Sequence, residues 1–272
     1  MIILVTGSKG FVCKNLVNRI LGRYEVKTND FNVLNFDECL SNVSKVDVVV
    51  HLASKIDASE SLKNPKDFIY NNYIGTLNIL EAMRINKIRK LIFLSSQGIY
   101  GNNINVDEDD ISKISVLEPY SLGKLLCENT IQLYSRVYGI KYVIFRPSHL
   151  YGFNQNIGII PLLLNKIITN PDIEIGNNVN RDFLNVEDLI DAVIMTLDME
   201  DNCIFNLGSG TQTTLMQLIE IISKILNKKV NVTINKDLVR NAKSERWHEL
   251  ANTNKIKFLG WYPKHELRTW LN

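Results

Sequence analysis

The chain has 272 residues, of which 45% are hydrophobic and 22% are charged, with 31 basic against 29 acidic side chains. This length suits one large α/β domain, or a dinucleotide-binding domain with a smaller companion, and the apolar fraction excludes a disordered protein. A net charge of +2 gives no electrostatic basis for binding nucleic acid. The longest apolar runs, residues 46–53 and 157–164, are too short to cross a membrane and are interrupted by Asp47, His51 or Pro161.

Four cysteines are spread along the chain at positions 13, 39, 127 and 203. They form no C-x-x-C pair and no histidine stands at ligand spacing, so neither a metal site nor a disulfide scaffold is predicted. The first five residues are apolar, but Gly7 follows almost at once, which does not fit a signal peptide. The sequence therefore predicts a reduced, cytoplasmic protein without a metal.

Short β-branched runs alternate with longer segments of helical spacing. The strand-like runs cover residues 2–6, 26–28, 46–51, 90–94, 142–145 and 204–206, and the helical segments cover 10–22, 66–86, 119–138 and 186–197. Continuous apolar strands that alternate with amphipathic helices predict a parallel sheet covered on both faces. The predicted fold class is therefore α/β, a Rossmann-type doubly wound parallel sheet.

This alternation loosens after Tyr151. Residues 154–156 and 176–180 are rich in turn formers, and all three tryptophans fall in the last 26 residues. We predict a Rossmann-type domain over residues 1–155, to which the chain returns at about 181–207. Residues 156–180 and 208–272 are predicted to form a small C-terminal substrate-binding lobe.

A glycine-containing turn joins the first predicted strand to the first helix. Its sequence is Thr6-Gly7-Ser8-Lys9-Gly10-Phe11-Val12-Cys13. Gly7 permits a tight turn, and Gly10 lets backbone N–H groups approach a pyrophosphate at the helix N-terminus. Asp30 closes the second strand, where a carboxylate accepts both ribose hydroxyls and repels a 2′-phosphate, which favours NAD over NADP.

Three residues form a candidate acid–base site. Tyr120 and Lys124 stand four residues apart on one helical face, and Ser96 follows the strand-like run at 90–94, where ligands bind in this fold class. A tyrosine that acts as a base at neutral pH needs its pKa lowered from about 10 to about 7. We expect a Lys124 ammonium about 5 Å away to supply most of this change and Ser96 to hydrogen-bond the reacting oxygen.

With these motifs the chain resembles the extended short-chain dehydrogenase/reductase family of NAD-dependent nucleotide-sugar epimerases, dehydratases and reductases. Further matching segments are His51-Leu52-Ala53-Ser54, Asn72-Tyr73-Ile74-Gly75-Thr76, Arg146-Pro147, Tyr151-Gly152, residues 181–188, Asn206-Leu207-Gly208-Ser209-Gly210 and Leu259-Gly260-Trp261-Tyr262-Pro263. The resemblance implies that Ser96, Tyr120 and Lys124 are catalytic. It implies NAD contacts from Gly7, Lys9, Gly10, Phe11, Val12, Asp30, Asn32, Val33, Leu52, Ala53, Ser54, Asn72, Ser95, Tyr120, Lys124 and Pro147. It implies contacts with a nucleotide-diphosphate sugar from Ser96, Gln97, His149, Arg181 and Arg246.

The chain departs from this family at several positions. Gln97 and Gly98 stand where the 4,6-dehydratases carry an Asp–Glu pair, so a dehydratase is not predicted. His149 replaces the usual asparagine, and either a phosphate contact or a purely structural histidine fits that position. Cys13 replaces the third glycine of the cofactor turn, and the segment from 153 to 180 is short for the family.

Three functions remain open on the sequence alone. The leading interpretation is an epimerase that oxidises a sugar ring hydroxyl, most simply at C4, and reduces the ketone on its other face. The alternative is a 4-ketoreductase that reduces a keto sugar once, which the short lobe mildly favours. A non-catalytic dinucleotide-binding regulator is disfavoured by the intact Ser96, Tyr120 and Lys124 set. The resemblance also implies a homodimer that pairs through the helices holding Asn72 and Tyr120.

Overall fold

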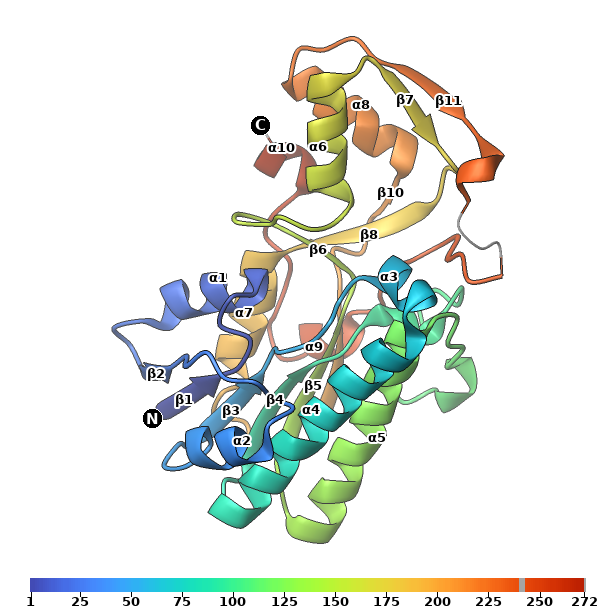
Figure 1. The fold of residues 1–272 in the computed structure, drawn as a ribbon. Coiled ribbons are helices and arrows are strands. Elements are labelled where there is room, and N and C mark those ends of the chain that lie inside the picture. The colour runs from blue at the N-terminus through green and yellow to red at the C-terminus, as the bar shows by residue number, and fades with distance from the viewer. Residues whose placement is uncertain (240–242, 272) are drawn as a thin grey trace.

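The computed structural model describes residues 1–239 and 243–271. Its centre is a six-stranded parallel sheet in the order β2-β1-β3-β4-β5-β9 (Figure 1). These strands are β1 (Ile2–Val5), β2 (Glu25–Lys27), β3 (Val48–His51), β4 (Lys90–Leu94), β5 (Lys141–Pro147) and β9 (Cys203–Leu207). The predicted Rossmann-type fold is confirmed.

Helices cover both faces of this sheet (Figure 1). They are α1 (Phe11–Ile20), α2 (Phe36–Asn42), α4 (Pro65–Asn86), α5 (Pro119–Tyr138), α7 (Val186–Met195) and α9 (Asn254–Lys257). The short helix α3 (Ala58–Lys63) packs instead on α4 and α5. One buried cluster joins the sheet to α1 and α7, and a second joins it to α2, α4 and α5. Because both faces are covered, β3 is buried along its whole length, which explains its uninterrupted apolar sequence.

The strand order places the ligand-binding edge. From β1 the chain crosses to β2 on one side, and from β2 it returns to β3 on the other side of β1. Helices therefore leave in opposite directions beside the carboxyl ends of β1 and β3, which opens a crevice there. Gly7 and Leu52 lie at this edge, directly after the two strands.

A smaller assembly stands above the carboxyl edge of the sheet (Figure 1). Its elements are β6 (His149–Tyr151), α6 (Ile159–Thr169), β7 (Asp172–Ile175), β8 (Asn180–Asn185), β10 (Gln212–Thr214), α8 (Leu215–Ile225), β11 (Asn231–Ile234) and α10 (Leu267–Leu271). The strands form two sheets, β10-β8-β6 and β11-β7, and a separate apolar cluster packs α6 against α8.

Short 3₁₀ helices span Gln97–Tyr100, Ile111–Lys113 and Lys236–Leu238.

The predicted lobe boundaries do not follow these clusters throughout. Ile256 and Trp261 lie in the 208–272 segment, yet they pack in the cluster that joins the central sheet to α1 and α7. The Trp261 indole also donates to the Asp188 carbonyl at 2.9 Å. Trp270 packs against Tyr151 in the lobe cluster. The C-terminal segment thus returns to the large domain at α9, and the remaining boundaries stay predictions.

Two further features concern the described ranges alone. No helix in them combines the length and hydropathy needed to cross a bilayer. Within the same ranges, no cluster of histidine, cysteine or acidic side chains is arranged to hold a metal ion. All four cysteines are free, and Cys13, Cys39 and Cys127 are buried.

Candidate active site

The turn after β1 has a backbone that only glycine adopts easily. Gly7 has φ +78°, and a Cβ there would lie 2.9 Å from the Ala53 nitrogen. The Thr6 hydroxyl joins the two loops, because it accepts hydrogen bonds from the backbone nitrogens of Leu52 at 3.1 Å and Ala53 at 3.0 Å. Gly10 caps α1 without a side-chain hydrogen bond, so the first N–H groups of the helix face the crevice unblocked. This cradle fits the pyrophosphate of a dinucleotide.

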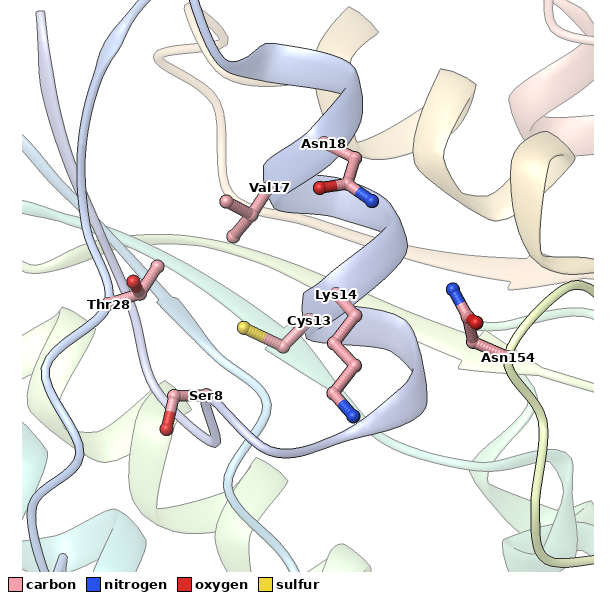
Figure 2. A pocket seen from close by; sticks show the side chains of 7 residues that line it. All are labelled: Ser8, Cys13, Lys14, Val17, Asn18, Thr28 and Asn154. Carbon is pink, nitrogen blue, oxygen red and sulfur yellow. The ribbon is translucent and has the colours of Figure 1, made fainter.

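Cys13 takes the place of the third glycine in that turn. It is 1% exposed and packs in the cluster between α1 and the sheet, where burial raises the pKa of its thiol to about 11. It also lines a small pocket of about 250 Å³ beside the turn (Figure 2). The other lining residues are Ser8, Lys14, Val17, Asn18, Thr28 and Asn154. The thiol is therefore a packing group.

Asp30 lies beyond β2 and faces the glycine turn. Its carboxylate pairs with the Lys9 ammonium at 2.5 Å and accepts from the Ser8 hydroxyl at 3.4 Å. The hydrogen bond from Lys9 lowers the pKa of Asp30. Both partners are exposed, so the carboxylate is available to ribose hydroxyls, and its discrimination against NADP stays a prediction.

The remaining predicted cofactor residues surround this crevice. Asn72 of α4 exchanges two hydrogen bonds with the backbone of Lys55, at 2.8 and 2.9 Å, and so fixes the loop that contains Ser54. Val33 packs against Gly75, whose Cβ would approach it to 2.7 Å. The other predicted positions lie at the start of α1 (Phe11, Val12), in the loop after β2 (Asn32), directly after β4 (Ser95) and at the end of β5 (Pro147).

The three predicted catalytic residues come together at the end of β4. Ser96 caps a short 3₁₀ helix, and its hydroxyl accepts from the Gly98 nitrogen at 3.0 Å. Tyr120 and Lys124 lie in the first two turns of α5. The Lys124 ammonium donates to the Leu94 carbonyl at 2.8 Å and lies 5.8 Å from the centroid of the Tyr120 ring.

The electrostatics of Tyr120 differ from the sequence prediction. Burial raises the pKa of Tyr120 to about 12, and the charge that opposes this most is Arg246, followed by a hydrogen bond with Ser96. Burial also lowers the pKa of Lys124 to about 8. The Lys124 ammonium is held by the Leu94 carbonyl over the ring faces of Phe93 and Tyr120, and its share in lowering the pKa of Tyr120 during catalysis stays a prediction.

A buried ion pair beneath the site was missed by the sequence analysis. The Arg146 guanidinium donates to both carboxylate oxygens of Glu128, with Nη2 to Oε2 at 2.7 Å and Nε to Oε1 at 3.1 Å. Glu128 also accepts from Ser95, and Arg146 contacts the Tyr100 hydroxyl. The only sequence signal was the position of Glu128, four residues after Lys124 on the same helical face.

The predicted substrate residues surround a second missed acid, Glu249. Its carboxylate accepts from His149 Nδ1 at 2.9 Å and from Arg246 Nη1 at 3.2 Å. Burial opposes ionisation of Glu249, but His149 and Arg246 outweigh it and hold the pKa at about 2. Burial lowers the pKa of His149, so this ring is neutral at neutral pH. His149 thus has a structural partner within the site.

The side chains of Arg181 and Gln97 form hydrogen bonds with other groups of the protein. The Arg181 guanidinium donates to the carbonyls of Asn180 at 3.0 Å and Arg246 at 2.7 Å, and it pairs with Glu245 at 3.3 Å. The Gln97 amide donates to the Arg146 carbonyl at 3.0 Å. Gln97 directly follows Ser96 in the chain, and the contacts of both Gln97 and Arg181 with a substrate stay predictions.

This geometry is matched by known proteins. A sequence profile described as the NAD dependent epimerase/dehydratase family aligns with residues 3–208. The chain belongs to this family. The predicted membership of the extended short-chain dehydrogenase/reductases, the use of NAD and the enzymatic nature of this epimerase/dehydratase protein are thereby confirmed.

Individual relatives span nearly the whole chain. A Methanocaldococcus jannaschii protein, provisionally named as a UDP-glucose 4-epimerase, is 33% identical over 98% of this chain and 94% of its own length. The dTDP-4-dehydro-6-deoxyglucose reductase of Escherichia coli is 28% identical over 88% of this chain and 86% of its own. The crystal structure of the Thermotoga maritima UDP-glucose 4-epimerase with UDP-glucose has a TM-score of 0.86 and 25% identity, covering 100% of this chain and 96% of that one.

Proposed function

We propose that this family member is a nucleotide-sugar 4-epimerase. The observation that carries the proposal is the meeting of Ser96, Tyr120 and Lys124 at the carboxyl edge of the sheet, beside a glycine turn shaped for a pyrophosphate. The M. jannaschii and T. maritima proteins support the reaction type. UDP-glucose is therefore the first substrate to test.

The side chains divide the work of this reaction. The glycine turn, Asp30 and Lys124 would hold NAD, which would supply the acceptor and the donor of the hydride. Tyr120 takes the proton of the ring hydroxyl and later gives it back, while Ser96 hydrogen-bonds the same oxygen. The ammonium of Lys124 would hold a hydroxyl of one cofactor ribose, and the carboxylate of Asp30 would accept from the other ribose. Arg181 and Arg246 bring guanidinium groups to the side on which the nucleotide diphosphate would bind.

The direct test is conversion of UDP-glucose to its C4 epimer, followed by NMR of the anomeric proton, together with mass spectrometry of NAD retained by the purified protein. Replacement of Tyr120 by phenylalanine removes one oxygen and should reduce turnover by about 10² or more, because general acid–base catalysis contributes that much. Tyr138→Phe, at the exposed end of the same helix, is the matched control and should retain full turnover. Near-normal turnover in Tyr120→Phe contradicts the mechanism.

A 4-ketoreductase is the second candidate. The E. coli reductase matches most of this chain, and the segment between residues 153 and 180 is short. A protein purified free of cofactor that consumes NADH with a 4-keto nucleotide sugar, and leaves UDP-glucose unchanged, supports the reductase over the epimerase.

We also propose that the protein is a cytoplasmic homodimer that pairs through α4 and α5. These helices pack side by side on the outer surface of one sheet face (Figure 1). They expose large apolar side chains that a monomer would leave in water, namely Tyr70, Ile85, Leu133, Val137 and Tyr138. Four free cysteines support the proposed reducing compartment.

A further inference from the structure

A charged group from the C-terminal segment enters the catalytic site. The side chain of Arg246 is 13% exposed, and its Nη1 donates to Glu249 at 3.2 Å. Glu249 is itself buried and is braced by His149 of β6 at 2.9 Å. Within the described ranges Glu249 is the hydrogen-bond acceptor of this guanidinium, which is therefore held from one side only.

Gly98 shows how closely this guanidinium approaches the catalytic groups. A Cβ at position 98 would lie 3.3 Å from Arg246 Nη1, 3.2 Å from the Ser96 hydroxyl and 2.2 Å from the Ser121 hydroxyl. The three polar atoms thus converge on the space that a side chain would fill. Glycine at this position allows a cation from another part of the chain to lie next to Ser96.

The charged and titratable groups that face Tyr120 come from three directions. Burial raises its pKa, and Glu118 and Cys127 raise it further, whereas Arg246 and Ser96 lower it. Lys124 contacts the face of the ring. The Arg246 guanidinium interacts with the carboxylates of residues 118, 245 and 249. Arg181 donates to the backbone carbonyl of Arg246, and His149 shares the partner Glu249.

We propose that Arg246 is a positioning residue for the acid–base step, a fixed positive charge that stabilises the ionised form of Tyr120. Glu249 and His149 hold it in place from the lobe side of the site. This inference rests on the proposed function only in taking Tyr120 as the acid–base group. It adds to Lys124 a second cation that acts on Tyr120, from a residue 122 positions away from that lysine.

The structure offers two substitutions with opposite expected signs. Arg246→Met removes the cation and should raise the pKa of Tyr120 by about one unit or more. Glu249→Gln leaves the cation without its counter-charge and should lower the pKa, because the amide can still accept from Arg246 and donate to His149. A purely structural role predicts the same direction of change for both variants.

The experiment measures Tyr120 in two ways. One is the pH–rate profile with UDP-glucose, and the other is an NMR titration of protein labelled at the tyrosine Cζ carbons, with the Tyr120 signal assigned by Tyr120→Phe. Arg246→Lys should show less than half of the pKa change that Arg246→Met causes, since lysine keeps the positive charge. Arg19→Met removes an exposed cation on α1 and is the matched control, expected to move neither readout.

The proposal is supported if the pKa of Tyr120 rises in Arg246→Met and falls in Glu249→Gln. The proposal is overturned if folded Arg246→Met leaves the titration midpoint of Tyr120 unchanged, or if it raises KM without moving the pH–rate profile. In either case Arg246 only binds substrate or braces the loop. If Arg246→Met does not fold, Glu249→Gln decides by itself, because a midpoint that stays or rises also overturns the proposal. The NMR titration needs no turnover, so failure to epimerise UDP-glucose contradicts the proposed function and leaves this test intact.

Discussion

His51 shows what one buried residue contributes to the cofactor edge. The ring is 1% exposed at the end of β3, with Nδ1 2.8 Å from the Thr6 hydroxyl and Nε2 3.2 Å from the Thr76 hydroxyl. These contacts connect β1, β3 and α4 directly below the loop that holds Gly7. Burial, and then the charge of Lys124, lower the pKa of His51 to about 3.

The pKa of His51 predicts a loss of stability in mild acid. The unfolded chain binds a proton near pH 6.5, whereas the folded ring binds none until about pH 3, so stability falls as the pH decreases from 6.5 towards 3. Between pH 7.5 and pH 5 this residue should account for a loss of about 2 kcal/mol. In His51→Gln, the unfolding free energy measured in urea should lose this part of its pH dependence. His248→Gln, at an exposed histidine, serves as the control, and an equal change in both variants contradicts the assignment.

At the scale of elements, the position of α5 decides whether the catalytic groups meet. The helix supplies Tyr120 and Lys124 from its first two turns, and one turn later Glu128 ties it to Arg146 of β5. The side chains of this pair are 1% and 4% exposed. Buried pairs of this kind add little over an apolar alternative, but the removal of one partner leaves an uncompensated charge.

Glu128→Gln should therefore cost about 3–5 kcal/mol of unfolding free energy, measured in urea. The chain contains a matched control, because Arg84 forms a similar two-pronged contact with Glu81 on the exposed surface of α4. Glu81→Gln should cost less than about 1 kcal/mol, since water screens that pair. Similar losses in the two variants would show that burial of the Glu128 pair does not matter.

At the scale of the whole molecule, the exposed apolar side chains of α4 and α5 predict the oligomeric state. Sedimentation should give a particle of twice the 31.1 kDa chain mass. Leu133→Asp and Val137→Asp should produce monomers, because each places a charge in an apolar contact. Ile168→Asp, at a similarly exposed apolar position on α6, should leave the dimer intact. A monomeric wild-type protein contradicts the pairing.

Much of this protein can be predicted from local patterns in the sequence. The β-branched runs, the helical spacings and the Gly7–Gly10 turn each depend on neighbouring residues, so the fold class and the cofactor edge follow from them. Tyr120 and Lys124 are a fixed helical distance apart, and their closeness is likewise local. The family resemblance rests on the same segments.

The tertiary structure decided which charges act on those residues. Glu128 reaches Arg146, and Arg246 reaches the space beside Ser96, over separations of 18 and 150 residues that no local pattern encodes. Tyr120 itself is partly buried, which raises its pKa, and the Lys124 ammonium donates to a backbone carbonyl. Pairing at a distance and exclusion of water are properties of the packed chain, because both depend on segments that meet only after folding. For that reason the sequence determined which residues are predicted to be catalytic, and the folded structure alone determined the electrostatic field in which they lie.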